Sequence, residues 1–340
     1  MSDPDPRPDA QADGLVCAYV LDGLGGGRLI ESAQIGTHLD GFLWVHLQRT
    51  GKEARRWLWE ESGLDWVVCN ALLGSSEMPT RQWIEEGHSQ SMYYKGGISI
   101  NLRGVNLNPG ADENDMITVR AWFDSDQVIT VRERHVEAIK DIRGRIAASE
   151  GPTGPADFLV LLAERLADRI GVALASLQEV IDDMEMAAIS EQAPELRKNL
   201  GSLRRRAIAK RRHLLPQRDA LSRLSQGQVP WMEEHHRAQL SAIADRTALQ
   251  VEDLQALRER AAVIQDEIMN QLSAGLNRTM YLLSVIAAIF LPLGFVTGLL
   301  GVNLAGIPGR EWPWAFPVAC IVFAAIGAIE VWLFRRWKLF

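Results

Sequence analysis

The chain has 340 residues, a mass of 37.9 kDa and a formal net charge of -7, with 47% hydrophobic and 23% charged residues. The length suits two structural units, and the composition excludes a collagen-like or wholly disordered chain. The acidic balance argues against nucleic acid as a partner and favours a cation, because a surface that binds nucleic acid needs basic residues to neutralise phosphates. Three scattered cysteines are too few for a disulfide framework or a cysteine-rich zinc site.

Residues 1–14 are acidic and rich in proline, and we expect a disordered tail there. Residues 15–150 predict a cytoplasmic α/β domain. Its expected strands are Leu15–Leu21, Phe42–Leu47, Ser89–Tyr94, Ile98–Leu107, Met116–Phe123 and Gln127–Arg132, and its expected helices are Lys52–Ser62 and Glu133–Ala148. The glycine-rich stretch 22–28 predicts a turn and not a phosphate-binding loop, because Arg28 stands where a dinucleotide motif requires glycine.

Residues 151–278 predict a cytoplasmic helical funnel or stalk. Helices are expected over Ala156–Leu224, interrupted near Pro194, and one helix of roughly 60–70 residues is expected to begin near Met232. Apolar residues from Leu240 to Leu272 recur in steps of three and four, which is typical of a coiled-coil seam. A helix this long with one apolar seam requires partners, because it is not stable alone.

Residues 279–340 contain two segments of membrane-spanning length. Thr279–Leu300 has 22 residues without a charge, and Ala315–Phe334 has 20 residues with a single charge at Glu330. Both segments reach the roughly 20 residues that a helix needs to cross a bilayer, so we favour two spans over a buried hairpin of a soluble domain. A basic group, Arg335, Arg336 and Lys338, follows the second segment, and the positive-inside rule therefore places both termini in the cytoplasm.

One face of the first predicted span carries small, polar or medium-sized side chains, and we expect this face to continue the seam. Its members are Asn277, Met280, Ser284, Ala287, Leu291, Gly294 and Gly298. Small residues allow membrane helices to pack closely. Copies of the face around a symmetry axis would instead leave a narrow lumen. Because two spans cannot enclose a path, transport through such a lumen requires a ring of identical subunits.

The first span ends in the triplet Gly301, Val302 and Asn303. A Gly-x-Asn triplet between a long helix and a second span with a basic tail resembles the CorA superfamily of divalent-cation transporters. Val302 and the segments 102–109 and 116–123 are similar to its ZntB zinc transporter branch. This resemblance covers the chain from about Leu15 onward. It implies a homopentameric funnel with an α+β soluble domain, a pore lined by the first span, and rings of Asn303 at its mouth. It also implies Zn²⁺ uptake coupled to protons (Zn²⁺:H⁺ symport) across a bacterial inner membrane.

The first span lacks histidine, cysteine and carboxylate, which are the usual Zn²⁺ ligands. We therefore expect the cation to enter with its water shell and Asn303 to contact that shell, an arrangement that would suit Mg²⁺ equally well. Glu330 is a candidate proton site, or it lies at the interface or pairs with Arg335 or Arg336. The seven histidines show no ligand spacing, and the adjacent His235 and His236 are expected to point in different directions.

These observations leave three functions open. The first is a Zn²⁺ transporter, with protons, membrane lipid and other divalent cations as further partners. The second is a CorA-type Mg²⁺/Co²⁺ channel. The third is a membrane-anchored coiled-coil scaffold, which would show no ion flux. We expect no enzyme and no resident cofactor, because the sequence shows neither a nucleophile–base arrangement nor a cofactor fingerprint.

Overall fold

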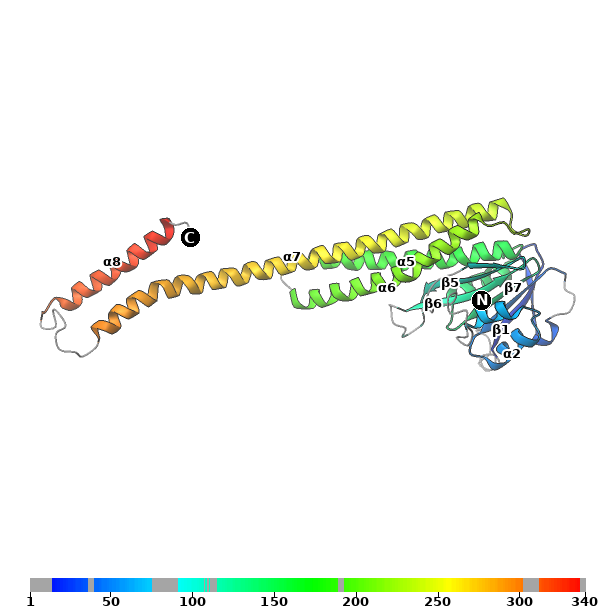
Figure 1. Cartoon of the computed structure of the whole chain (residues 1–340), viewed down its shortest axis with the longest axis horizontal. Helices are drawn as coiled ribbons and strands as arrows, with labels where there is room; N and C mark the ends of the chain where they lie inside the picture. Colours follow the sequence, from blue (N-terminus) through cyan, green and yellow to red (C-terminus); the bar gives the residue numbers. More distant parts are fainter. Residues whose placement is uncertain are drawn as a thin grey trace. The chain divides into compact units, whose positions relative to one another are not determined.

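Seven strands form one mixed sheet in the N-terminal part of the chain (Figure 1). They are β1 (Leu15–Leu21), β2 (Gly27–Ile30), β3 (Phe42–Gln48), β4 (Ser91–Tyr94), β5 (Gly97–Val105), β6 (Met116–Phe123) and β7 (Gln127–Arg132). Their order across the sheet is β2-β1-β3-β7-β6-β5-β4, and β3 pairs with β7 in parallel whereas the other neighbours are antiparallel.

This computed structural model describes residues 14–35, 40–74, 91–106, 108, 110, 115–188, 193–301 and 312–336. Within them the chain forms two units, residues 1–265 and residues 266–340. Almost all of the predicted N-terminal tail lies outside the described residues.

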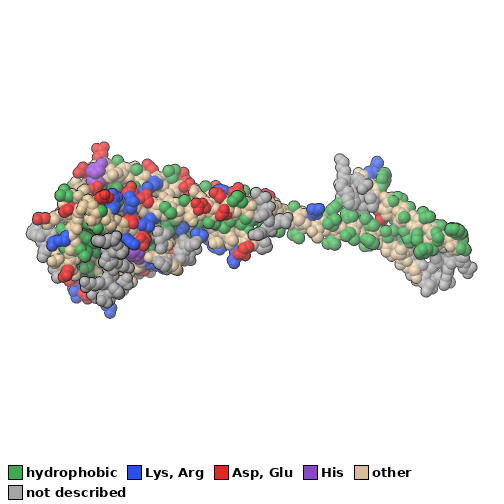
Figure 2. All heavy atoms as spheres, turned by 180° about the vertical axis from the view of Figure 1, so that it is seen from behind, with side chains coloured by type: hydrophobic (Ala, Val, Ile, Leu, Met, Phe, Trp, Pro, Cys, Tyr) green, Lys and Arg blue, Asp and Glu red, His purple; other side chains and the backbone are tan. Residues whose placement is uncertain are grey.

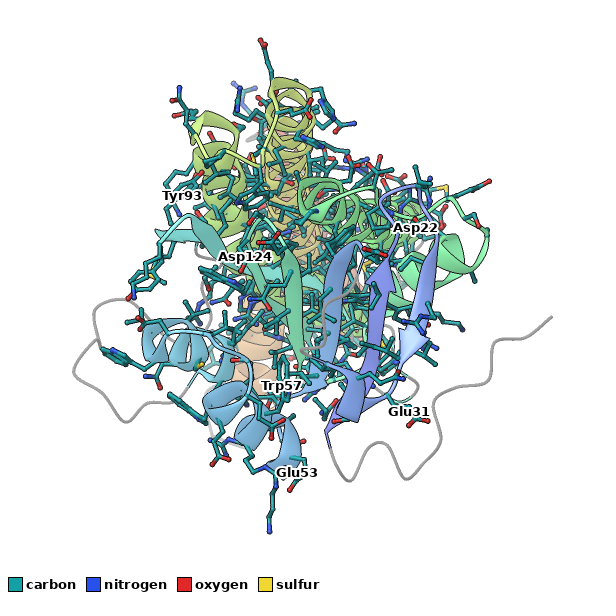
Figure 3. The ribbon with its side chains drawn as sticks, turned by 90° about the vertical axis from the view of Figure 1, so that its right-hand side faces the viewer. Asp22, Glu31, Glu53, Trp57, Tyr93 and Asp124 are labelled. Atoms are coloured by element: carbon teal, nitrogen blue, oxygen red, sulfur yellow. The ribbon has the colours of Figure 1, made fainter. Side chains whose placement is uncertain are left out.

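Helices cover both faces of the sheet, because its strands carry apolar side chains on both sides. Trp44 of β3 lies on one face with Phe158 of α5 (Pro155–Ala188), and the two ring centroids are 4.8 Å apart. The next residue, Val45, belongs to the second core, together with Trp57 and Leu72. Figure 3 shows α2 (Lys52–Glu60), which carries Glu53 and Trp57, on the side of the sheet away from the long helices. The period-two alternation along β3 thus supplies both cores.

The remaining helices of the first unit surround these cores. They are α2 (Lys52–Glu60), α3 (Trp66–Leu73), α4 (Glu137–Ala147), α5 and α6 (Ala193–Gln226), with the short 3₁₀ helix η1 at Ser32–Gln34. The prediction missed β2 and α3. It also began α4 four residues too early, because the backbone at Val136 is still extended, with φ -126° and ψ 107°. The turn between β1 and β2 is closed by Asp22, whose carboxylate accepts from the backbone N–H groups of Leu24 and Gly26.

α7 (Glu234–Leu300) is a single helix of 67 residues, and α8 (Ala315–Arg336) has 22. The predicted long helix is therefore present. Among the described residues, α7 is the one helix long and apolar enough to span a membrane, and its apolar window is not buried in the structure. The apolar part of α8, Phe316–Glu330, is shorter. Figure 2 shows apolar side chains over most of the visible surface of the second unit.

Candidate ion pathway

The side chains predicted to line a lumen are all exposed in the protomer. The set comprises Asn277, Met280, Ser284, Ala287, Leu291, Gly294 and Gly298 of α7. A different set on the same helix is half-buried: Tyr281, Val285, Ala288, Ile289, Leu293 and Val296. At about 100° per residue the two sets lie on different faces of the helix. The protomer therefore leaves the candidate lumen face uncovered.

The candidate lumen face does not continue the buried seam, so that expectation was wrong. The buried seam of α7 includes Leu240, Leu254, Ala261 and Ile268, and it ends before Leu272, which is 45% exposed. Steps of seven residues along α7 from these four residues do not arrive at any member of the candidate lumen face. An exposed series does reach it, at spacings of seven along the sequence: Leu249, Ala256, Val263, Asn270, Asn277 and Ser284. The helix face opposite the buried seam therefore continues along α7 as the candidate lumen face.

Hydroxyl groups on the apolar part of α7 are bonded to their own helix. Ser284 Oγ donates to the Met280 carbonyl oxygen at 2.9 Å. Thr297 Oγ1 lies 2.9 Å from the Leu293 carbonyl oxygen. Such bonds satisfy the hydroxyls locally. Of these two residues, Ser284 belongs to the candidate lumen face. The face thus offers a neutral oxygen among mostly small side chains, which suits a cation that keeps its water shell better than a dehydrated Zn²⁺.

The glycines of this helix differ in the space around them. A Cβ added at Gly294 or Gly298 would meet nothing within 4 Å, whereas one at Gly301 would lie 3.1 Å from the Thr297 carbonyl oxygen. The N–H of Gly301 donates to that same oxygen at 2.9 Å, so the helical hydrogen bonding reaches the first residue of the triplet. Val302 and Asn303 lie outside the described residues.

Glu330 is half-buried on α8, and its Oε2 atom is buried without a hydrogen-bond partner in the described part of the chain. Within that part, no ion pair joins Glu330 to Arg336. The Arg336 guanidinium lies 5.6 Å from the centroid of the Trp332 ring. The side chain of Arg335 and all of Lys338 lie outside the description. Among the described residues, Glu330 thus has one carboxylate oxygen without a hydrogen-bond partner.

His235 and His236 do not point in different directions, contrary to expectation. Their ring centroids are 3.7 Å apart, and His236 Nε2 lies 2.9 Å from Asp157 Oδ1. No sequence pattern indicated this cluster, because Asp157 precedes His236 by 79 residues and reaches it only when α5 packs beside α7. Figure 2 shows exposed histidine next to acidic side chains on the first unit.

Comparison with known proteins decides the family. The family model described as CorA-like Mg²⁺ transporter protein matches residues 40–336. The chain belongs to the CorA-like family. The predicted resemblance is therefore confirmed, as is the expectation that the chain is not an enzyme, because this family consists of ion transporters.

Relatives match the CorA-like chain over nearly its whole length. The divalent cation transporter CmaX of Pseudomonas aeruginosa is 36% identical over 328 residues, which cover 95% of this chain and 96% of CmaX. The zinc transport protein ZntB of Pectobacterium carotovorum is 35% identical over 331 residues, covering 97% and 98%. A solved structure of full-length CmaX has a TM-score of 0.82 at 34% identity, covering 96% of this chain and 98% of that one. The α+β soluble domain and long helix are thus a CorA-like fold.

Proposed function

We propose that this CorA-family protein transports Zn²⁺ across a bacterial inner membrane, with both termini in the cytoplasm. The observation that carries the proposal is the uncovered, uncharged small-residue face of α7, in a chain that resembles ZntB from end to end. Two helices, α7 and α8, span the bilayer, and the basic residues Arg335, Arg336 and Lys338 follow the second span on the cytoplasmic side. CmaX, the other close relative, is named for divalent cations in general.

The transporting unit is a homopentamer. One protomer contributes two spans, which cannot enclose a path, and within the described residues the candidate lumen face is exposed. Closed symmetry lets the same face of each copy meet a common axis. Native mass measurement of the protein in a detergent that preserves flux should therefore give five copies. A monomer or dimer under those conditions would exclude the pore.

Zn²⁺ crosses with water around it, and Asn303 contacts that water at the mouth of the pore. The lumen face from Asn277 to Gly298 contains no histidine, cysteine or carboxylate, so direct four-ligand coordination has no donors there. Asn303→Ala should abolish flux without changing assembly. Cys320→Ser should preserve flux, because Cys320 lies on α8. If Cys320→Ser abolished Zn²⁺ transport in an intact pentamer, sulfur coordination would replace this mechanism.

The membrane potential drives uptake. Two positive charges moving inward across about 100 mV gain roughly 4.6 kcal/mol, so no nucleotide is required. Protons enter with the metal, and Glu330 carries them, because its carboxylate is the charged group within a span. In Glu330→Gln, Zn²⁺ flux should persist but lose its dependence on the pH gradient. If the pH dependence of flux is unchanged in Glu330→Gln, that carboxylate is not the carrier.

Flux into proteoliposomes tests the whole proposal. Zn²⁺ and Mg²⁺ uptake should be measured with and without a pH gradient, and Zn²⁺ uptake should be faster and should increase with the gradient. A specific observation favours a CorA-type Mg²⁺/Co²⁺ channel as the second candidate, because the lumen face lacks Zn²⁺ ligands and suits any hydrated divalent cation. Preferential Mg²⁺ or Co²⁺ flux would support that channel. Absence of all flux would support a membrane-anchored scaffold.

A further inference from the structure

Two helix starts are joined by a hydrogen-bonded pair in the soluble unit. Asp157, in the first turn of α5, accepts from the hydroxyl of Thr153 and from its backbone N–H at 3.3 Å. Nδ1 of His236, in the first turn of α7, accepts a hydrogen bond from the backbone N–H of Glu233 at 3.2 Å. Because Nδ1 accepts a hydrogen bond, the proton of the neutral ring is on Nε2 and is donated to Asp157.

His235 completes a group of three side chains with metal-ligating atoms. One such atom each from Asp157, His235 and His236 lies within 4.8 Å of the others. His236 is buried and Asp157 half-buried, whereas the His235 side chain is 55% exposed. Nδ1 of His235 lies 3.4 Å from a carboxylate oxygen of Glu233. The cluster therefore combines a hydrogen-bonded pair with an exposed third side chain on the solvent side.

We propose that Asp157, His235 and His236 form a Zn²⁺ site where α5 and α7 begin, separate from the ion pathway. Two imidazole nitrogens and one carboxylate oxygen, with a water molecule, match the donor set of open tetrahedral zinc sites. Ligand atoms at about 2.0–2.1 Å from the metal lie about 3.3 Å apart in a tetrahedron. Asp157 and His236 are already near that separation, and rotation of the exposed His235 supplies the third nitrogen.

The charges around the cluster suit a cation. Glu233 and Glu234 precede the histidines in sequence, and Glu234, in the first turn of α7, offsets the partial positive charge at that helix start. The neighbouring cation, Arg237, is held by the Met232 carbonyl oxygen at 2.8 Å.

Metal binding here changes the start of α7. A Zn–N bond at His236 Nε2 requires the ring proton to move to Nδ1, so the neutral ring keeps one proton and none is released. The new Nδ1–H then faces the N–H of Glu233, and the hydrogen bond between them is lost. Occupancy of the site thus removes a cap from the helix that carries the candidate lumen face.

Zn²⁺ binding to the tag-free full-length protein in detergent tests the site. Equilibrium dialysis would count Zn²⁺ per protomer, and the visible spectrum of added Co²⁺ would report tetrahedral nitrogen coordination. Wild type is compared with His235→Ala and with His236→Gln, because glutamine keeps an acceptor for the Glu233 N–H. His135→Ala is the matched control, since His135 is also half-exposed and hydrogen-bonded to a carboxylate, that of Glu137.

Both site variants should lose one Zn²⁺ per protomer, with a fall in affinity beyond the roughly 10–100-fold typical of lost outer-shell partners. His135→Ala should bind as wild type does. Equal stoichiometry and affinity in all four proteins would overturn the site, as would equal losses in the control. The result is independent of the proposed function, because absence of Zn²⁺ flux in wild type would refute transport and leave this binding unchanged.

Discussion

At the scale of single residues, His46 shows how burial sets a charge state. Its side chain is fully buried in β3, and Nδ1 lies 2.8 Å from the Thr130 hydroxyl, which also accepts from the Trp44 indole N–H. Burial lowers the pKa of His46 well below 6.5, and the positive charges of Arg132 and Arg143 lower it further. The imidazole is therefore neutral in the folded protein throughout the physiological range.

This buried imidazole predicts acid sensitivity. The unfolded chain takes up a proton at His46 below about pH 6.5 and the folded chain does not, so stability falls as pH decreases, by up to about 1.4 kcal/mol per pH unit. Unfolding midpoints of the full protein should be compared with those of His46→Gln between about pH 7.5 and about pH 5.5. The variant should show a shallower decline. If the unfolding midpoints of both proteins fall equally steeply with pH, groups other than His46 cause the loss of stability.

Gly294 tests whether side-chain volume limits flux. A Cβ added there meets no described atom within 4 Å outside its own helix backbone, so we expect the leucine variant to fold and assemble, but five added side chains would narrow the lumen. We expect Gly294→Leu to reduce Zn²⁺ flux at least about tenfold, as for hydrophobic constrictions that exclude water. Gly327→Leu on α8 is the control, since its Cβ also has open space. Similar Zn²⁺ flux in Gly294→Leu and Gly327→Leu would show that Gly294 does not line the path.

At the scale of elements, α3 is defined by its two ends. Asp65 accepts from the Val67 backbone N–H at 3.1 Å, and its pKa is lowered to about 2, first by the hydrogen bond from Lys95 and then by that N–H. Gly74 ends the helix in the left-handed region, with φ 63°. The Arg120 guanidinium lies against this glycine and donates to the Leu72 carbonyl oxygen at 3.4 Å.

Substitution of Gly74 should therefore cost more than its backbone conformation alone. Alanine in the left-handed region costs about 1–2 kcal/mol. Gly63→Ala measures that cost by itself, because Gly63 has φ 70° and open space around it. Gly74→Ala also displaces Arg120 and should destabilise by about 1 kcal/mol more in thermal unfolding. In an Arg120→Ala background, Gly74→Ala and Gly63→Ala should destabilise the protein equally. If Gly74→Ala still costs more stability there, displacement of Arg120 is not the cause of the difference.

Sequence patterns predicted the strong elements of the sheet and missed the weak ones. β1, β6 and β7 have the predicted bounds, because each is a continuous run of β-favouring residues. β2 was missed because it has four residues, three of them exposed. α3 could have been found, since Asp65 and Gly74 are cap residues at helical spacing. The Asp157–His236 pair could not, because it depends on packing between helices far apart in the sequence.

At the scale of the whole molecule, the helix α7 runs through both units, and its buried and exposed faces are distinct. Its seam from Leu240 to Ile264 is buried within the first unit, whereas the opposite series, Leu249, Ala256 and Val263, is exposed and recurs every seven residues. Sequence periodicity found the seam and assigned the lumen to it, because the pattern alone does not tell which face the protomer covers. If five copies of α7 surround one axis, the uncovered series faces that axis.

A change of charge at Val263 tests this arrangement. Val263 is 68% exposed, so a charged residue there leaves the protomer fold intact. Five lysines around an axis would repel a divalent cation and five glutamates would attract it, so initial Zn²⁺ flux should fall in Val263→Lys and exceed that of the lysine variant in Val263→Glu. The difference should shrink as salt rises, because about 0.15 M salt screens charges beyond about 8 Å. Val172 of α5 is 72% exposed, and the same pair of substitutions there should leave flux equal. Equal Zn²⁺ flux in Val263→Lys and Val263→Glu would show that this face of α7 does not surround the path.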